Sequence, residues 1–80
     1  MEIQTFWNNC LIEISSLIPA DSYKTWIEPL RLKSIVNNEI TLLTSKGEIH
    51  SQFLEDKFKP IIQEITKRLT GTDYTINFES

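Results

Sequence analysis

Hydrophobic residues change their spacing three times along this 80-residue chain, and that pattern limits the fold more than any other feature. Over residues 3–18 they recur with the period of an α-helix and lie within an arc of about 140°. Pro19 marks the end of this predicted helix. A shorter helix is predicted to begin near Asp21 or Ser22 and to end at Pro29. The first third of the chain is therefore predicted to be helical.

The spacing then alternates between apolar and polar residues, as is typical of β-strands. Residues 30–43 alternate on both sides of the Asn-Asn pair at 37–38, which predicts a β-hairpin. Helical spacing returns over about residues 47–69, and residues 74–78 alternate again as a third strand. The chain is therefore predicted to form one α+β domain over residues 1–80, with its helices packed on a three-stranded sheet.

Composition indicates an ordinary soluble protein, with 40% hydrophobic and 24% charged residues. The N-terminus lacks the pattern of a signal peptide, and no apolar run is long enough to span a membrane. Cys10 is the only cysteine, so an intramolecular disulfide cannot form, which fits a reducing compartment. We therefore expect a cytoplasmic location. The net charge of −3 argues against a protein whose main task is to coat nucleic acid.

Residue types that carry catalysis or bind cofactors are scarce. The two glycines, Gly47 and Gly71, are too far apart for a phosphate-binding loop. His50 and Cys10 are the only histidine and cysteine, so one chain cannot assemble a soft metal site. Cys10 is predicted to be a buried, inert thiol, and His50 a surface residue near a helix start. We expect no enzyme activity, no cofactor and no metal.

Two stretches of sequence resemble a known family. Within the segment Ser22–Leu30 (SYKTWIEPL), Tyr23–Leu30 is similar to the [FY]-x-x-W-[IFM]-x-P-L pattern in domain I of the bacterial chromosomal replication initiator DnaA. Phe6–Leu11 resembles the first helix of that domain, and 40–42 and 53–61 resemble its strand and long helix. The chain departs from the pattern at 45–47, which reads Ser-Lys-Gly in place of Ala-Pro-Asn.

The resemblance implies a KH-like fold of order α-α-β-β-α-β, without the Gly-x-x-Gly loop that clamps nucleic acid. It also implies an interaction module that mediates initiator self-association and recruits the replicative helicase and regulatory adaptor proteins. The ATPase of the family lies in a later domain, which this chain does not contain. The sequence leaves open whether the chain is an excised N-terminal domain or a free-standing regulator that binds an initiator or helicase.

The resemblance assigns self-association to the first helix, at Trp7 and Leu11. The wide apolar arc of that helix suggests that one edge of it stays exposed, so we expect a weak symmetric contact there. The alternative is that Trp7 is simply a core residue, as a tryptophan at helical spacing usually is.

The helicase and adaptor contacts are predicted by helix phase as well as by the resemblance. Ile49 and Phe53 lie roughly 150° from the middle of the apolar arc of the long helix. If the second helix packs beside them, a small apolar patch with a polar margin forms. The alternative is that Ile49 and Phe53 cover the end of the second helix. The resemblance points to the same patch, although Ser22 replaces an acidic residue of some members and Ile49 replaces an aromatic one. The predicted patch comprises Ser22, Thr25, Trp26, Ile49 and Phe53.

Nucleic acid is a further candidate partner. Lys24, Arg31 and Lys33 form a local basic cluster near one predicted strand and could touch single-stranded DNA weakly. The missing Gly-x-x-Gly loop and the absence of an aromatic stacking run argue against a strong contact. The alternative is that these charges are ordinary solvated surface. No membrane or small-molecule partner is expected.

Overall fold

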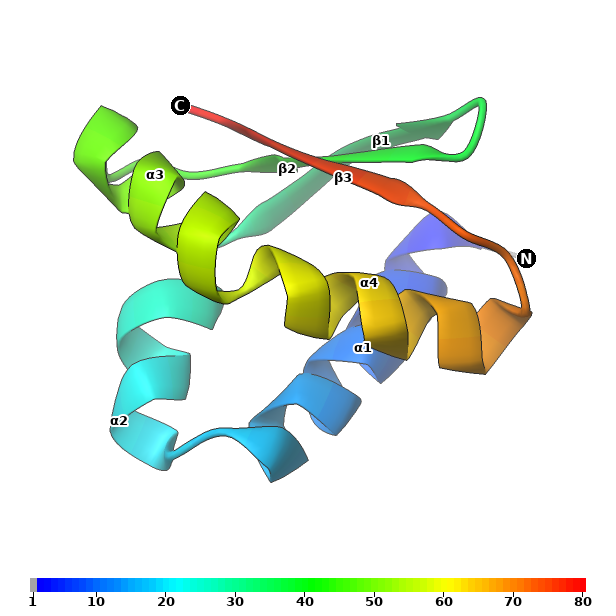
Figure 1. Cartoon of the computed structure of the whole chain (residues 1–80), viewed down its shortest axis with the longest axis horizontal. Helices are drawn as coiled ribbons and strands as arrows, with labels where there is room; N and C mark the ends of the chain where they lie inside the picture. Colours follow the sequence, from blue (N-terminus) through cyan, green and yellow to red (C-terminus); the bar gives the residue numbers. More distant parts are fainter. Residues whose placement is uncertain (1) are drawn as a thin grey trace.

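A computed structural model describes residues 2–80 and has a helical layer packed against one face of a three-stranded sheet (Figure 1). This confirms the predicted α+β class and its order of helices and strands, with two changes inside the helices. The elements are α1 (Ile3–Leu17), α2 (Ala20–Ser22), η1 (Tyr23–Ile27), β1 (Arg31–Val36), β2 (Glu39–Leu43), α3 (Glu48–Lys57), α4 (Lys59–Thr70) and β3 (Thr75–Glu79).

Helix α1 begins where its first free backbone amides find a partner. The Glu2 carboxylate accepts hydrogen bonds from the backbone N–H groups of Gln4 and Thr5, each at 2.9 Å. These bonds, together with one from the Thr5 hydroxyl, lower the pKa of Glu2. The helix buries Phe6, Trp7 and other residues of its apolar arc and ends just before Pro19, as predicted.

The second predicted helix is split in two, and this is the first departure from the sequence-based prediction. Three residues of α-helix (α2) pass directly into η1, a five-residue π-helix. In η1 the N–H of Glu28 donates to the carbonyl oxygen of Tyr23 at 2.9 Å, a bond across five residues. Pro29, which has no N–H to offer, then ends the helix. Single turns of π-helix are frequent at functional sites.

The sheet has the order β1-β2-β3. Strands β1 and β2 form the predicted antiparallel hairpin, and its turn places Asn37 and Asn38 at φ 51° and 62°. Asparagine tolerates this left-handed conformation better than most residues, which explains why the pair marks the turn. Strand β3 pairs with β2 in parallel, because the helices α3 and α4 carry the chain back across the sheet.

The long predicted helix is broken into α3 and α4 at Phe58, whose φ of −107° and ψ of −20° depart from the values of a regular helix. Pro60 follows in the first turn of α4, where its missing N–H is tolerated. The single helix predicted over about residues 47–69 is thus two helices. Because Pro60 supplies no hydrogen bond to the preceding turn, the break falls just before it.

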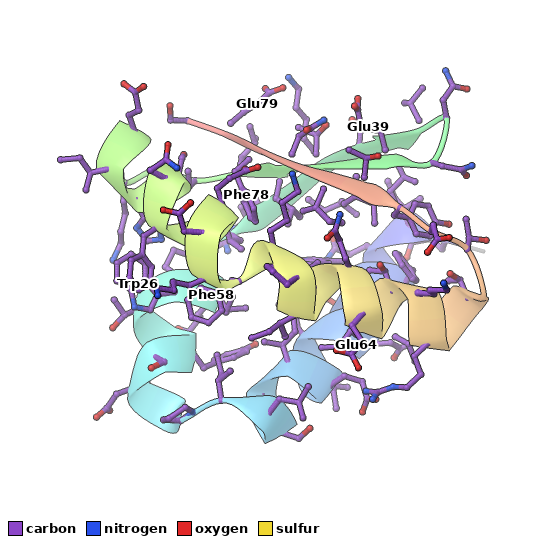
Figure 2. The ribbon with its side chains drawn as sticks, viewed as in Figure 1. Trp26, Glu39, Phe58, Glu64, Phe78 and Glu79 are labelled. Carbon is purple, nitrogen blue, oxygen red and sulfur yellow. The ribbon has the colours of Figure 1, made fainter. Side chains whose placement is uncertain are left out.

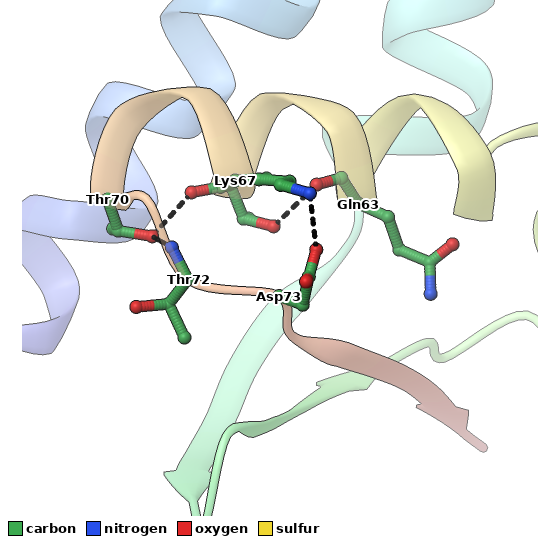
Figure 3. A network of polar contacts seen from close by, with 6 residues as sticks. Gln63, Lys67, Thr70, Thr72 and Asp73 are labelled. Atoms are coloured by element: carbon green, nitrogen blue, oxygen red, sulfur yellow. Dashed lines mark hydrogen bonds and ion pairs between the residues drawn. The ribbon is translucent and has the colours of Figure 1, made fainter.

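Gly71 and neighbouring side chains cap the C-terminal end of α4. Gly71 adopts φ 78°, a left-handed conformation that suits a residue without a Cβ atom. Figure 3 shows the polar contacts around this turn: the N–H of Thr72 donates to the hydroxyl oxygen of Thr70 at 3.1 Å, and Lys67 Nζ lies 3.1 Å from the Asp73 carboxylate. These contacts fix the direction in which the chain enters β3.

One hydrophobic core lies between the helices and the sheet. Cys10 lies in this core with no exposed surface, which confirms its predicted burial. Burial, with a smaller effect of Glu13, raises the pKa of the Cys10 thiol to about 11, so the thiol is protonated and unreactive at neutral pH. No helix within residues 2–80 is long and apolar enough to cross a membrane. The buried apolar residues are Phe6, Trp7, Cys10, Ile14, Ile27, Leu30, Ile40, Leu42, Leu54, Phe58, Ile62, Ile65 and Ile76.

Candidate protein-interaction site

An aromatic cluster joins the end of η1 to the start of α3. The rings of Trp26 and Phe53 stack with centroids 4.0 Å apart and planes 22° from parallel. Phe53 also contacts Phe58 at the helix break, with centroids 6.0 Å apart. Figure 2 places Trp26 and Phe58 close together where η1 meets α3, at one end of the helical layer. The condition set for the predicted patch, that the second helix packs beside the start of the long helix, is therefore met at Trp26 and Phe53.

Ile49 stands next to this cluster and is almost fully exposed. Its side chain keeps 88% of its accessible surface, the largest value for any large hydrophobic residue between 2 and 80. Trp26 and Phe53 are half-buried, so neither residue is fully covered by the rest of the domain. We name the surface formed by the five predicted residues the Trp26–Ile49 patch: Ser22, Thr25, Trp26, Ile49 and Phe53.

The polar residues of the Trp26–Ile49 patch come from α2 and η1. Thr25 is exposed and Ser22 is half-buried, so both can line the margin of the apolar centre. The two alternatives considered for Ile49 and Phe53 both hold in part: Phe53 covers the end of the second helix, whereas Ile49 does not. The exposure of Ile49 agrees with the predicted patch, and its role in binding stays a prediction.

His50 is the residue of this region that the sequence-based reasoning placed wrongly. It was expected at the surface, but it is only 6% exposed. Its ring meets the Trp26 ring edge-on, with centroids 4.6 Å apart and planes at 64°. The i, i+4, i+8 spacing of His50, Leu54 and Phe58, all buried, is the signal that could have revealed its position.

Trp7 is a core residue, and the expectation that it lies at an exposed edge is wrong. It retains 1% of its surface, because α1 packs against three elements, α4, β1 and η1, which together cover its wide apolar arc. Leu11 is half-buried, and with Trp7 beneath it lines a surface hollow of about 280 Å³. The other residues around this hollow are Gln4, Asn8, Tyr23, Glu28, Leu30, Arg31 and Leu32.

The three basic residues proposed for single-stranded DNA do not share one role. Arg31 donates hydrogen bonds to the backbone carbonyl oxygens of Glu28 and Leu30, both at 3.0 Å. Lys33 forms an ion pair with Glu79 of β3 at 2.8 Å. Only Lys24, exposed on η1, has no ion pair or side-chain hydrogen bond within residues 2–80. A DNA contact stays a prediction that these internal contacts do not favour.

Metal-binding groups are not brought together by the fold. Within the described part of the chain, no three histidine, cysteine or acidic side chains are close enough to hold a metal ion.

Comparisons with a known protein family and with individual known proteins agree with each other. Residues 4–68 match the family described as the DnaA N-terminal domain. The chain is 30% identical over 70 residues to the chromosomal replication initiator protein DnaA of Chromobacterium violaceum, an alignment that covers 88% of this chain and 15% of that protein. It is 27% identical over 81 aligned residues to the same protein of Geotalea uraniireducens, covering 96% of this chain and 17% of that protein. The chain thus spans about a sixth of the length of these relatives, and it belongs to the DnaA N-terminal domain family of chromosomal replication initiators.

Proposed function

We propose that this domain is the protein-interaction module of a replication initiator, and that the Trp26–Ile49 patch binds the replicative helicase and regulatory adaptor proteins. The observation that carries the proposal is the 88% exposure of Ile49 beside the stacked rings of Trp26 and Phe53. A partner protein that covers so exposed an aliphatic side chain is stabilised in the complex, because each buried methylene contributes about 0.8 kcal/mol.

The composition of the patch fits a transient protein interface. Such interfaces place a few aromatic and aliphatic anchors at their centre and polar residues at the rim. Trp26 and Ile49 supply the anchors here, and Ser22 and Thr25 supply the rim. The patch is small, so we expect a weak and reversible contact that becomes effective when several initiators act together.

Ile49→Ala tests the proposal. Truncation should weaken binding of the domain to the replicative helicase of the source organism by about 1–2 kcal/mol, roughly ten-fold in Kd. Because Ile49 is exposed, its truncation should change the free energy of unfolding by less than about 0.5 kcal/mol. Isothermal titration measures the first quantity and urea denaturation the second.

Ile12→Ala is the matched control for this experiment. Ile12 is also an exposed isoleucine on a helix, at 65% exposure, but it lies on α1 away from the aromatic cluster. It should bind the helicase like the wild type. Equal affinities for wild type and Ile49→Ala, with helicase binding intact, would exclude the Trp26–Ile49 patch as the contact.

Weak self-association through α1 is the second function we propose. The supporting observation is the hollow of about 280 Å³ beside Leu11, which offers a second copy a concave surface of both apolar and polar side chains. Leu11 would make the contact, and Trp7 would support it from the core. The proposed partners are therefore other copies of the initiator, the helicase and adaptors.

A further inference from the structure

His50 is buried at the base of the Trp26–Ile49 patch and touches Trp26 in two ways. The imidazole packs edge-on against the indole, with centroids 4.6 Å apart. Its Nε2 atom also lies 3.5 Å from the backbone carbonyl oxygen of Trp26, at the long end of hydrogen-bond distance. The indole also stacks on Phe53, so Trp26 contacts two side chains of α3.

The way in which η1 ends explains why the carbonyl of Trp26 is available to His50. The N–H of Glu28 donates to the carbonyl oxygen of Tyr23, and Pro29 has no N–H. The N–H of Leu30 donates to the carbonyl oxygen of Ile27 at 3.0 Å. Within residues 2–80, the Trp26 carbonyl therefore lacks the backbone donor that an α-helix would supply, and the His50 imidazole is the side-chain group beside it that can donate. A carbonyl oxygen only accepts, so a hydrogen bond across this contact requires the imidazole tautomer with its hydrogen on Nε2.

Ile49 and His50 share the first turn of α3 but face different surroundings. Successive residues of a helix point about 100° apart. As a result, Ile49 projects into solvent at 88% exposure while His50 turns inward at 6%. The first turn of α3 therefore exposes Ile49 and, through His50, also contacts Trp26.

We propose that His50 is a positioning residue of the Trp26–Ile49 patch: its Nε2–H and ring edge hold the last turn of η1 and the Trp26 indole in the orientation that a partner protein meets. This inference rests on the proposed function for its biological meaning, but the positioning itself can be measured on the isolated chain. A residue that only filled space could be replaced by any apolar side chain of similar size, whereas a positioning donor requires an N–H at the same place.

His50→Leu and His50→Gln separate these two roles. Leucine fills a similar volume without a donor, and the glutamine amide can restore the N–H toward Trp26. Iodide quenching of tryptophan emission reports on Trp26 alone, because Trp7 is 1% exposed and out of reach of the quencher. We expect the quenching constant to rise by about two-fold in His50→Leu and to stay near wild type in His50→Gln.

Helicase affinity is the second measurement on the same variants. We expect His50→Leu to bind roughly three- to ten-fold more weakly than wild type, and His50→Gln to bind within about two-fold of it. Circular dichroism at far-ultraviolet wavelengths confirms that both variants are folded. Quenching in His50→Leu equal to that of wild type would overturn the positioning role, as would failure of His50→Gln to restore it.

Quenching and helicase affinity together separate the positioning role of His50 from the proposed binding function of the Trp26–Ile49 patch. If quenching follows the expected order but neither His50→Leu nor Ile49→Ala alters helicase binding, then His50 positions Trp26 and the helicase binds elsewhere. If Ile49→Ala weakens binding while His50→Leu leaves both measurements unchanged, the Trp26–Ile49 patch stands and His50 does not position it.

Discussion

Replacing Trp7 with alanine is expected to lower the free energy of unfolding by about 3–5 kcal/mol. The indole is 1% exposed and packs among the residues that join α1 to α4 and the sheet, so its removal leaves a large cavity. Domains of this size are stable by only a few kcal/mol in total. Trp7→Ala should therefore be largely unfolded at 37 °C, as measured by thermal and urea denaturation.

Two milder variants separate the core role of Trp7 from any role in self-association. Trp7→Phe keeps an aromatic ring and removes the indole N–H, which is buried without a hydrogen-bond partner within residues 2–80, so it should cost only about 1–2 kcal/mol. Leu11→Ala removes the half-buried side chain at the hollow and should weaken self-association in sedimentation equilibrium while the domain stays folded. Full retention of stability in Trp7→Ala would contradict the burial of Trp7. Unchanged association in Leu11→Ala would exclude the hollow as the contact.

Replacing Trp26 with alanine is expected to cause the largest loss of partner binding that a single substitution can cause in this domain. Tryptophan at the centre of an interface commonly contributes more than about 2 kcal/mol, so helicase affinity should fall by roughly 30-fold or more. The substitution removes an anchor of the Trp26–Ile49 patch and also deprives Phe53 of its stacking partner. Titration of the helicase with each variant gives the ratio directly.

Tyr23→Ala is the control for the stability component of this effect. Tyr23 is also a half-buried aromatic residue of η1, but it faces the hollow beside Trp7 and Leu11 rather than the aromatic cluster. Both variants should lose comparable stability, about 1–3 kcal/mol. Only Trp26→Ala should lose helicase binding at temperatures where both are folded. Equal losses of binding in the two variants would mean that folding, and not the patch, sets the affinity.

The secondary structure could be predicted from the sequence because the hydrophobic period changes at prolines, glycines and the Asn37-Asn38 turn. The π-helix could not, since its five-residue hydrogen-bond span leaves the apolar spacing of a short helix almost unchanged. The break at Phe58 lies two residues before Pro60, because a proline disturbs the turn that precedes it as well as its own position.

The candidate site could be predicted only in part. Helix phase correctly predicted that Ile49 lies off the buried face of α3. On a straight helix, the face that a residue occupies follows from its position in the sequence, without information about the neighbouring elements. The burial of Trp7 depends on how many elements surround α1, and the sequence does not specify that number. The position of His50 depends on the orphan carbonyl at the end of η1, a feature that exists only in the folded chain.

The most direct test of the Trp26–Ile49 patch is an NMR titration of the ¹⁵N-labelled chain with unlabelled replicative helicase. The predicted result is that the largest changes occur at the amides of residues 22–26 and 48–53 and at the Trp26 indole N–H, while the buried Trp7 indole changes little. Glu39 and Glu79 lie on the sheet, on the other side of the domain from Trp26 (Figure 2), and should be unaffected. Changes concentrated on the sheet, with residues 22–26 and 48–53 undisturbed at saturation, would contradict the account.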